Sequence, residues 1–266
     1  MKLLDGQELS EFIKERQARE VRRLRQAAHT TPRLLILKDS DNPVIEIYVR
    51  MKKRYAEDIG ATVDIKTVAT NKLAHEIEKA NTDKAVHGVI VQLPILQPEL
   101  TDEICDQIAP EKDVDGLGKN AKYDSATATA IDYLLAGYNI ELTNKKIALV
   151  GYGKLVGRPL SALWRSSNYD VTVFRSKDND RLSEVLPKFD VVVSATGMPA
   201  ILKTEMIKAG AVVVDAGTAS ENGVIMGDVS EDLCKRKDIM ITPTVGGVGP
   251  LTISALFDHL LRAADE

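Results

Sequence analysis

A lysine on a predicted helix is the first residue of this chain whose type and position could do chemistry. Lys52 follows Tyr48 by four residues, so the two share one face of a helix predicted over 44–59. If burial lowers its pKa, a lysine can transfer protons near neutral pH. Most lysines are surface residues, and a tyrosine one turn away can simply cover the aliphatic part of the side chain.

Polar side chains beside apolar runs are a second group of candidates. Gln92 ends the run Val-Ile-Val at 89–91, where a buried polar side chain needs a hydrogen-bond partner. Asp113 and Asp115 lie in Lys-Asp-Val-Asp-Gly at 112–116, and Asp-Gly pairs also favour turns. The Gly- and Pro-rich segment 242–252 predicts a shaped loop whose backbone could line a flat ligand.

A glycine-rich turn after the apolar run 147–150 indicates a dinucleotide site. Its spacing, G-x-G-x-x-x-G from Gly151 to Gly157, also suits an ordinary strand–turn–helix connection. Glycines let the backbone approach a phosphate, and a helix N-terminus supplies free N–H groups. About 20 residues later, where such folds bind the ribose, Arg175 stands in place of the acidic residue typical of NAD sites. A guanidinium suits the 2′-phosphate of NADP, although NAD stays possible and an exposed loop charge is the simpler alternative.

The predicted cofactor residues extend beyond this turn. The segment Val-Ser-Ala-Thr-Gly at 193–197 ends an apolar run in small residues, which allow a ligand to approach the carboxyl end of a strand. The full set is Gly151, Gly153, Lys154, Val156, Gly157, Arg175, Ser176, Thr196 and Gly197.

The elements that must position these residues alternate along the chain. Strands are predicted at 34–37, 61–65, 86–91, 147–150, 171–174, 191–194, 212–214 and 239–241, because continuous Val/Ile runs are typical of parallel strands buried on both faces. Helices are predicted at 10–27, 44–59, 71–79, 99–107, 127–137, 160–166, 181–186 and 252–264. The alternation predicts an α/β fold, and its restart after residue 143 indicates two α/β domains.

Composition excludes several functional classes. A length of 266 residues suits one large or two small domains, and 28% charged residues are typical of a soluble protein. The net charge of −4 does not suggest a nucleic-acid partner, and no apolar run approaches the roughly 18 residues of a membrane helix. Two distant cysteines, Cys105 and Cys234, argue against a disulfide framework or a zinc cluster. We therefore expect a cytoplasmic protein without a metal.

Five motifs in order carry a family resemblance. They are Tyr-Val-x-x-Lys at 48–52, Val-Gln-Leu-Pro at 91–94, Pro-Glu-Lys-Asp-Val-Asp-Gly at 110–116, Gly-Asp-Val at 227–229 and Gly-Gly-Val-Gly-Pro-Leu-Thr at 246–252. Over nearly the whole chain the sequence resembles the bifunctional methylenetetrahydrofolate dehydrogenase/methenyltetrahydrofolate cyclohydrolase family, FolD. The resemblance implies a homodimer of chains with two α/β domains, a folate cleft between them, and a Rossmann-like second domain.

The resemblance also implies an activity and a division of labour. One reaction oxidises 5,10-methylene-tetrahydrofolate to the 5,10-methenyl form with NADP⁺, and the other hydrolyses that product to 10-formyl-tetrahydrofolate. The implied catalytic residues are Lys52, Gln92 and Asp115, and the implied folate-binding residues are Tyr48, Gly249, Pro250 and Thr252. We assign the catalytic domain to 1–120, completed by a helix at 250–266, and the NAD(P)-binding domain to 121–249.

Departures from the family pattern leave alternatives open. The cofactor turn reads Gly151-Tyr152-Gly153, where the family usually has Gly-Arg-Ser or Gly-Ala-Ser, and the segment 125–130 keeps only Thr127 of the family motif. The alternatives are a cyclohydrolase alone with a degenerate cofactor site, and a non-catalytic folate- or nucleotide-binding protein. The lysine at position 52 argues against the second alternative, because binding alone does not need it.

Overall fold

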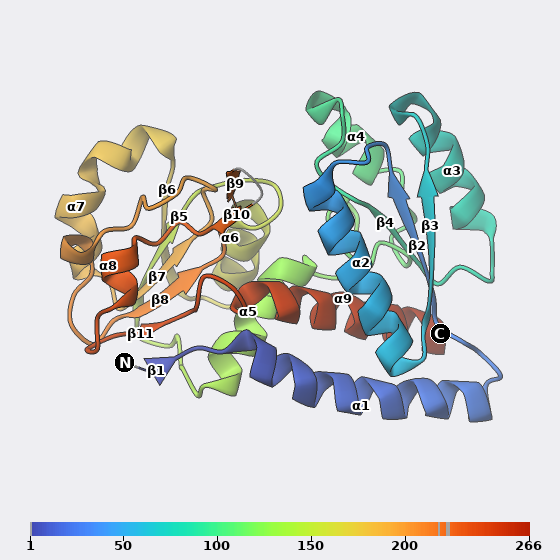
Figure 1. The fold of residues 1–266 in the computed structure, drawn as a ribbon, viewed down its shortest axis with the longest axis horizontal. Helices are drawn as coiled ribbons and strands as arrows, with labels where there is room; N and C mark the ends of the chain where they lie inside the picture. Colours follow the sequence, from blue (N-terminus) through green and yellow to red (C-terminus); the bar gives the residue numbers. More distant parts are fainter. Residues whose placement is uncertain (1, 218, 222–223) are drawn as a thin grey trace. The chain divides into compact units, whose positions relative to one another are not determined.

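The computed structural model describes residues 2–217, 219–221 and 224–266 (Figure 1). Contacts divide the chain into two compact units. The three-stranded unit comprises Glu11–Ala126 and Ile253–Glu266, and the six-stranded unit comprises Met1–Ser10 and Thr127–Thr252. Helices α1 (Gly6–Ala27) and α9 (Val248–Asp265) each contribute residues to both units.

A parallel sheet in the order β3–β2–β4 forms the centre of the three-stranded unit. Its elements are β2 (Arg33–Lys38), α2 (Pro43–Ile59), β3 (Thr62–Thr67), α3 (Thr70–Thr82), β4 (Gly88–Val91), η1 (Pro98–Leu100) and α4 (Thr101–Cys105). Leu35 and Leu37 face the same side of β2, because side chains alternate along a strand, and they belong to one buried cluster with Leu73 and Ile77 of α3. Just beyond β4, the Gln92 N–H donates to the Leu37 carbonyl at 2.8 Å, which keeps the carboxyl ends of both strands side by side.

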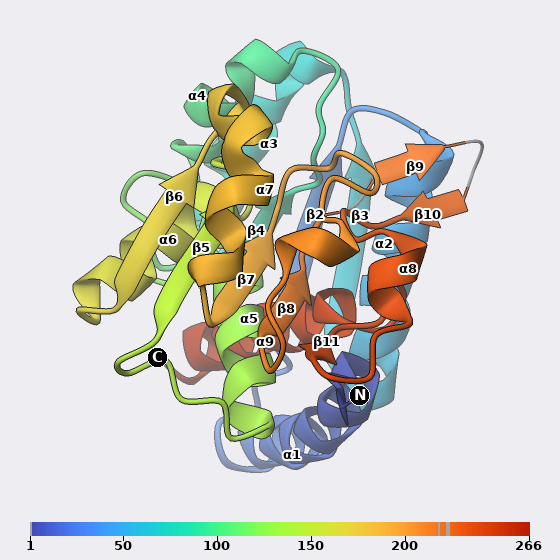
Figure 2. The ribbon, with the colours of Figure 1, turned by 90° about the vertical axis from the view of Figure 1, so that its left-hand side faces the viewer.

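The six-stranded unit has a parallel sheet in the order β1–β11–β8–β7–β5–β6 (Figure 2). The strands are β1 (Lys2–Leu3), β5 (Lys146–Val150), β6 (Asp170–Phe174), β7 (Val191–Ser194), β8 (Val212–Asp215) and β11 (Met240–Ile241). Both β7 and β8 are buried at every position, as continuous valine runs require. Helical segments are α5 (Ala126–Gly137), α6 (Gly157–Ser166), η2 (Ser176–Arg181), α7 (Leu182–Val185), η3 (Leu186–Lys188), η4 (Thr204–Met206) and α8 (Glu231–Cys234). An antiparallel pair, β9 (Ala219–Glu221) and β10 (Val224–Met226), completes the unit.

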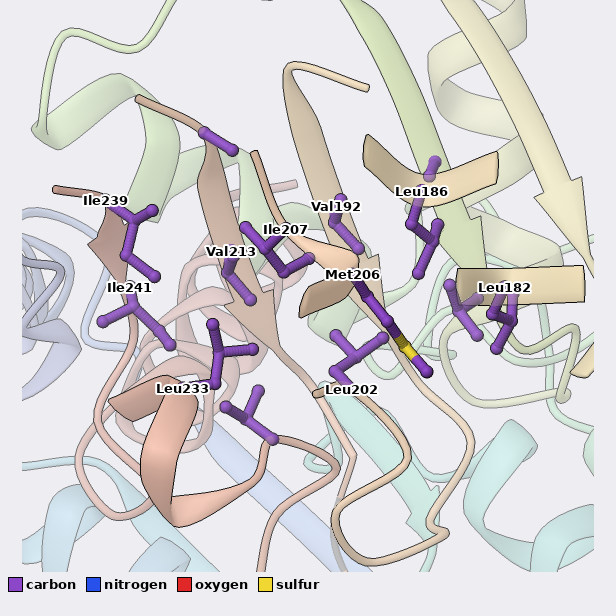
Figure 3. Packing of buried hydrophobic residues seen from close by; sticks show 14 residues of the cluster. Leu182, Leu186, Val192, Leu202, Met206, Ile207, Val213, Leu233, Ile239 and Ile241 are labelled. Carbon is purple, nitrogen blue, oxygen red and sulfur yellow. The ribbon is translucent and has the colours of Figure 1, made fainter. Parts of the chain in front are cut away.

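A buried apolar cluster covers one face of this sheet (Figure 3). Leu182 and Leu186, from the α7 and η3 segments, pack with Val192 of β7 and Val213 of β8. Because the cluster fixes β7 and β8 against these segments, the loops that follow the strands start from rigid positions.

The α/β fold with parallel sheets is confirmed, and several element bounds differ from the prediction. The helix predicted at 99–107 is a short 3₁₀ turn followed by α4, and that predicted at 181–186 is reduced to α7. Strands β1, β9 and β10 and helix α8 were not predicted, because they are too short to show a periodic pattern. Residues 1–10 belong to the six-stranded unit, not with the rest of 1–120, because β1 pairs with β11.

The last helix also starts earlier than predicted. It begins at Val248, so Gly249 and Pro250 lie in its first turn and not in a loop. Proline fits there because the first N–H groups of a helix have no intrahelical acceptor. Within the described ranges, no helix is long and apolar enough to cross a membrane, and no group of three metal-ligating side chains occurs.

Candidate active site

Lys52 and Gln92 meet in the three-stranded unit. Lys52 lies on α2 with only 8% of its surface exposed, and its Nζ donates a hydrogen bond to Gln92 Oε1 at 2.6 Å. The amide nitrogen of Gln92 donates to the Leu93 carbonyl at 3.2 Å, which leaves the amide oxygen facing the lysine. The polar residue at the end of an apolar strand has thus found the partner that its burial requires.

Burial and a nearby carboxylate set the proton affinity of this site. Burial lowers the pKa of Lys52, and the charge of Asp115 opposes that shift. Burial also raises the pKa of Asp115 to about 6, against the effect of Lys52. Both groups are therefore displaced toward neutral pH, where each can exchange a proton.

Asp113 builds the loop that presents Asp115. Its side chain is 1% exposed, with Oδ1 accepting from the Gly116 N–H at 3.0 Å and Oδ2 from the Gly118 N–H at 2.7 Å. Gly116 has a φ of 67°, and a Cβ there would lie 2.3 Å from the Asp124 carbonyl oxygen, so the turn requires glycine. The turn chemistry expected of Asp-Gly belongs to Asp113, and Asp115 is left half-buried beside Lys52.

A histidine that the sequence analysis did not single out supports the same loop. His259 of α9 is buried, its Nδ1 lies 2.9 Å from the Val114 carbonyl oxygen, and its ring stacks on Tyr123 with centroids 4.9 Å apart. Burial lowers the pKa of His259, so the neutral ring donates through Nδ1–H to the carbonyl. A lone histidine on an apolar helix face carries no motif that could have revealed this contact.

A cavity of about 680 Å³ opens in the six-stranded unit at the carboxyl ends of β5, β6 and β7. Its lining residues are Gly151, Tyr152, Gly153, Arg158, Arg175, Ser176, Asn179, Ala195, Thr196 and Met198. The described lining includes two arginines and no carboxylate, so the cavity favours an anionic ligand. Carboxyl ends of parallel strands are where α/β folds bind nucleotides.

The glycines of the turn are required by its geometry. Gly151 has a φ of 102°, and a Cβ there would lie 2.4 Å from the Ala195 carbonyl oxygen. A Cβ on Gly157, the first residue of α6, would lie 2.4 Å from the Gly151 oxygen, so helix and turn pack closely. A Cβ on Gly153 would have nothing within 4 Å, which leaves open space for a ligand. Together with the two arginines, this turn fits a dinucleotide with a phosphorylated ribose.

Asp228 of the Gly-Asp-Val motif at 227–229 binds the loop after β7, which lines the cavity. Asp228 is fully buried, and its Oδ2 accepts from the Ser194 hydroxyl at 2.6 Å, the Thr196 N–H at 2.7 Å and the Thr196 hydroxyl at 2.8 Å. The Thr196 oxygen in turn accepts from the Met198 N–H at 3.0 Å. Asp228 thereby fixes the loop after β7, a role that the motif alone did not reveal.

The remaining predicted site residues are those that line the cavity, those next to the lining residues in sequence, and those predicted to bind folate. Gly151, Gly153, Arg175, Ser176 and Thr196 line the cavity, whereas Lys154, Val156, Gly157 and Gly197 lie beside the lining residues in sequence. Tyr48 is half-buried on α2, one turn before Lys52. Gly249 is exposed, Pro250 is buried, and the Thr252 hydroxyl donates to the Val248 carbonyl at 3.3 Å. The sequence analysis missed Arg158 and Asn179, although Arg158 directly follows the last glycine of the turn.

Two family models cover almost the whole chain. Residues 4–115 match the tetrahydrofolate dehydrogenase/cyclohydrolase catalytic domain, and residues 125–266 match the NAD(P)-binding domain of the same family. The chain belongs to this family. The bifunctional protein FolD of Lactobacillus helveticus is 37% identical over 274 residues, which span 98% of this chain and 96% of that relative.

Solved structures of the family have the same fold. The bifunctional enzyme FolD of Campylobacter jejuni superimposes with a TM-score of 0.92 at 32% identity, covering 100% of this chain and 99% of that one. The Trypanosoma brucei FolD enzyme, complexed with NADP cofactor and inhibitor, gives a TM-score of 0.91 at 29% identity, covering 99% and 97%. By family models and solved structures alike, this chain is a FolD protein with an NAD(P)-binding domain.

Proposed function

We propose that this FolD protein oxidises 5,10-methylene-tetrahydrofolate with NADP⁺ and hydrolyses the resulting 5,10-methenyl-tetrahydrofolate to 10-formyl-tetrahydrofolate. One observation carries the proposal: the buried Lys52 ammonium hydrogen-bonded to Gln92, with the Asp115 carboxylate near it. Mere binding of a folate has no use for a lysine whose pKa is lowered. We keep 1–120 with the helix at 250–266 as the proposed catalytic domain, except that residues 1–10 pack with the six-stranded unit, and 121–249 as the proposed NAD(P)-binding domain.

In the hydrolysis, Lys52 moves the proton. Water adds to the methenyl carbon, and the neutral amine of Lys52 takes a proton from it. The ammonium returns that proton to the ring nitrogen as the carbon–nitrogen bond breaks, and the remaining hydroxyl proton leaves through the amine to bulk water as the formyl C=O forms. Gln92 orients the lysine through its amide oxygen. The Asp115 carboxylate accepts hydrogen bonds from the amino-pyrimidine edge of the pterin, since it offers two acceptors to adjacent N–H donors. Further folate contacts come from Tyr48, Gly249, Pro250 and Thr252.

In the oxidation, the protein binds and orients the two reactants. Gly151 and Gly153 let the backbone approach the pyrophosphate, and Arg175 and Ser176 bind the 2′-phosphate of the ribose. Thr196 and Gly197 line the dinucleotide on the side of β7. Lys154 and Val156 lead into α6, and Gly157 begins this helix, whose N-terminus faces the phosphates. NADP⁺, when bound, supplies the hydride acceptor.

The activity is tested with paired assays on the purified chain. Methylene-tetrahydrofolate is supplied with NADP⁺ or NAD⁺ and reduced cofactor is followed by absorbance, and methenyl-tetrahydrofolate is supplied alone for the hydrolysis. Lys52→Ala should lower hydrolysis by at least about a hundredfold, the usual size of a general acid–base contribution, with an unchanged circular dichroism spectrum. Lys53→Ala, the exposed neighbour, is the matched control and should keep full activity. Full activity of Lys52→Ala would contradict the assignment, and hydrolysis without cofactor reduction would support a cyclohydrolase alone.

The assembly and location of the protein extend the proposal. We expect a homodimer, as the family resemblance implies, and a cytoplasmic enzyme, since among the described residues neither Cys105 nor Cys234 forms a disulfide. Sedimentation equilibrium tests the first expectation, because a monomer mass would exclude the dimer. Fractionation of the producing cells tests the second.

A further inference from the structure

The guanidinium of Arg175 lies over the ring of Tyr152 in the cofactor cavity. Its Cζ atom is 4.4 Å from the ring centroid, well within the range of a cation–π contact, and both residues line the cavity. Tyr152 stands between the two glycines of the turn, in the position where the family usually has arginine or alanine. The aromatic ring thus meets a cation that comes from the next strand of the sheet.

The N–H groups of the Arg175 guanidinium are without an acceptor in the part of the chain that the structure describes. Among the described residues, no carboxylate or carbonyl oxygen binds its guanidinium, whereas surface arginines such as Arg23 and Arg236 are paired with carboxylates. The nearest acidic residue in sequence, Asp178, accepts instead from the Arg175 backbone N–H at 2.9 Å. The ring of Tyr152 therefore fixes one face of the guanidinium while its N–H groups stay available.

We propose that Tyr152 is a specificity-determining residue that selects NADP over NAD by holding Arg175 in the orientation that binds the 2′-phosphate. The inference rests on the proposed function and deepens it. A guanidinium binds phosphate through two parallel N–H groups, so its plane must be oriented before the bond forms. Stacking on Tyr152 supplies this orientation, and Arg175, directly after β6, takes the place of the arginine that the family often has between the two glycines.

A different role for the same ring predicts a different result. If the ring of Tyr152 stacked on the adenine, it would contribute equally to NADP and to NAD, because both carry that base. The ratio of the dissociation constants, Kd for NAD over Kd for NADP, separates the two roles. It is measured by isothermal titration calorimetry with each cofactor, and it does not depend on catalysis.

The experiment is a double-mutant cycle on the full chain with Tyr152→Ala, Arg175→Ala and the double variant. Tyr152→Ala should lower the ratio about two- to fivefold, the factor that corresponds to an exposed cation–π contact. Arg175→Ala should lower it about tenfold or more, as expected for hydrogen bonds to a charged group, and adding Tyr152→Ala to it should have no further effect. Tyr152→Phe should retain the ratio, since the ring is kept.

Controls separate a local effect from a loss of structure. Tyr169→Ala removes another half-buried tyrosine of the same unit that does not line the cavity, and it should leave the ratio unchanged. Thermal unfolding followed by circular dichroism checks every variant, and Tyr152→Leu replaces the alanine variant if that one does not fold. Equal weakening of NADP and NAD by Tyr152→Ala, or an equal effect with and without Arg175, would overturn the proposal. If the unmodified chain bound neither cofactor, the proposed oxidation itself would fail, and this inference with it.

Discussion

The hydrogen bond between Gln92 and Lys52 predicts that two substitutions of Gln92 shift the pKa of Lys52 in opposite directions. In Gln92→Met the lysine loses its acceptor at 2.6 Å, and in Gln92→Glu it gains a negative charge in the same place. The first change makes the ammonium form less stable, and the second makes it more stable. The pKa of Lys52 should therefore fall in the methionine variant and rise in the glutamate variant.

The magnitudes follow from the type of interaction. A hydrogen bond to a charged group contributes about 1.5–3 kcal/mol, and one pKa unit corresponds to about 1.4 kcal/mol, so Gln92→Met should lower the pKa of Lys52 by roughly one to two units. An opposite charge within hydrogen-bond reach shifts a pKa by about one to three units, so Gln92→Glu should raise it by that amount. If the neutral amine is the active form, each unit of increase lowers the rate tenfold at a pH below the pKa.

The assay is the pH dependence of kcat/KM for hydrolysis of methenyl-tetrahydrofolate, which reports ionisations of the free enzyme. The limb of the profile that belongs to Lys52 should move to lower pH in Gln92→Met and to higher pH in Gln92→Glu. Gln107→Glu is the matched control, because Gln107 is an exposed glutamine whose side chain binds only a helix carbonyl. The role assigned to the pair would be refuted if the profiles of the unmodified chain, Gln92→Met and Gln92→Glu superimposed, or if both variants shifted the limb in the same direction.

Three further predictions concern the supports of the two sites. Asp113→Ala should cost about 1–3 kcal/mol in urea unfolding, because two buried N–H groups lose their acceptor, and should also reduce hydrolysis by displacing Asp115; unchanged hydrolysis would separate the loop from the activity. Gly157→Ala should destabilise the protein by roughly 1–3 kcal/mol because its Cβ would lie 2.4 Å from a backbone oxygen, whereas Gly153→Ala, with open space, should not change the unfolding midpoint. Asp215 has a folded pKa raised by burial to about 6, so it contributes stability that is present below about pH 4 and is lost as the pH rises through 6. In Asp215→Asn this part of the pH dependence, up to roughly 3 kcal/mol, should disappear from the urea-unfolding free energy, and an unaltered dependence would exclude Asp215 as its source.

The parallel strands and the long helices could be predicted because each carries a pattern that its environment requires. Continuous valine runs at 191–194 and 212–214 are buried on both faces, and the helix predicted at 44–59 is α2 within one residue at its start. The two-residue strand β1 contains too few residues for any period, so its pairing with β11, which was predicted at 239–241, decides it. The start of α9 was misplaced for a local reason, because glycine and proline indicate a loop unless they occupy a first helical turn.

The candidate site was predictable only where a residue type is unusual for its place. Gln92 was a candidate because it ends an apolar strand, and Lys52 because it shares a helix face with Tyr48. The structure places Gln92 and Lys52 in contact. The contact between Tyr152 and Arg175 could not be predicted in this way, since it joins two strand ends that are 23 residues apart and carry no shared pattern. The role of Asp228 was equally hidden, because a short Gly-Asp-Val motif gives no indication of the three donors that its carboxylate binds.

The two aspartates of the segment at 112–116 show how hydrogen bonds decide which carboxylate is left for chemistry. Both oxygens of Asp113 accept hydrogen bonds from backbone N–H groups. Burial raises the pKa of Asp113, and these bonds oppose that rise. Among the described residues no hydrogen bond reaches the Asp115 carboxylate, so only the charge of Lys52 opposes its burial, and its pKa stays near 6. The Asp113 carboxylate cannot bind a ligand without giving up the hydrogen bonds that hold the loop. The Asp115 carboxylate has no such bonds in the described residues, so it can accept hydrogen bonds from the N–H groups of a substrate. In the segment Asp-Val-Asp-Gly the first aspartate therefore holds the loop and the second is left for the folate contact that we propose, and exchanging the two roles would require a different turn.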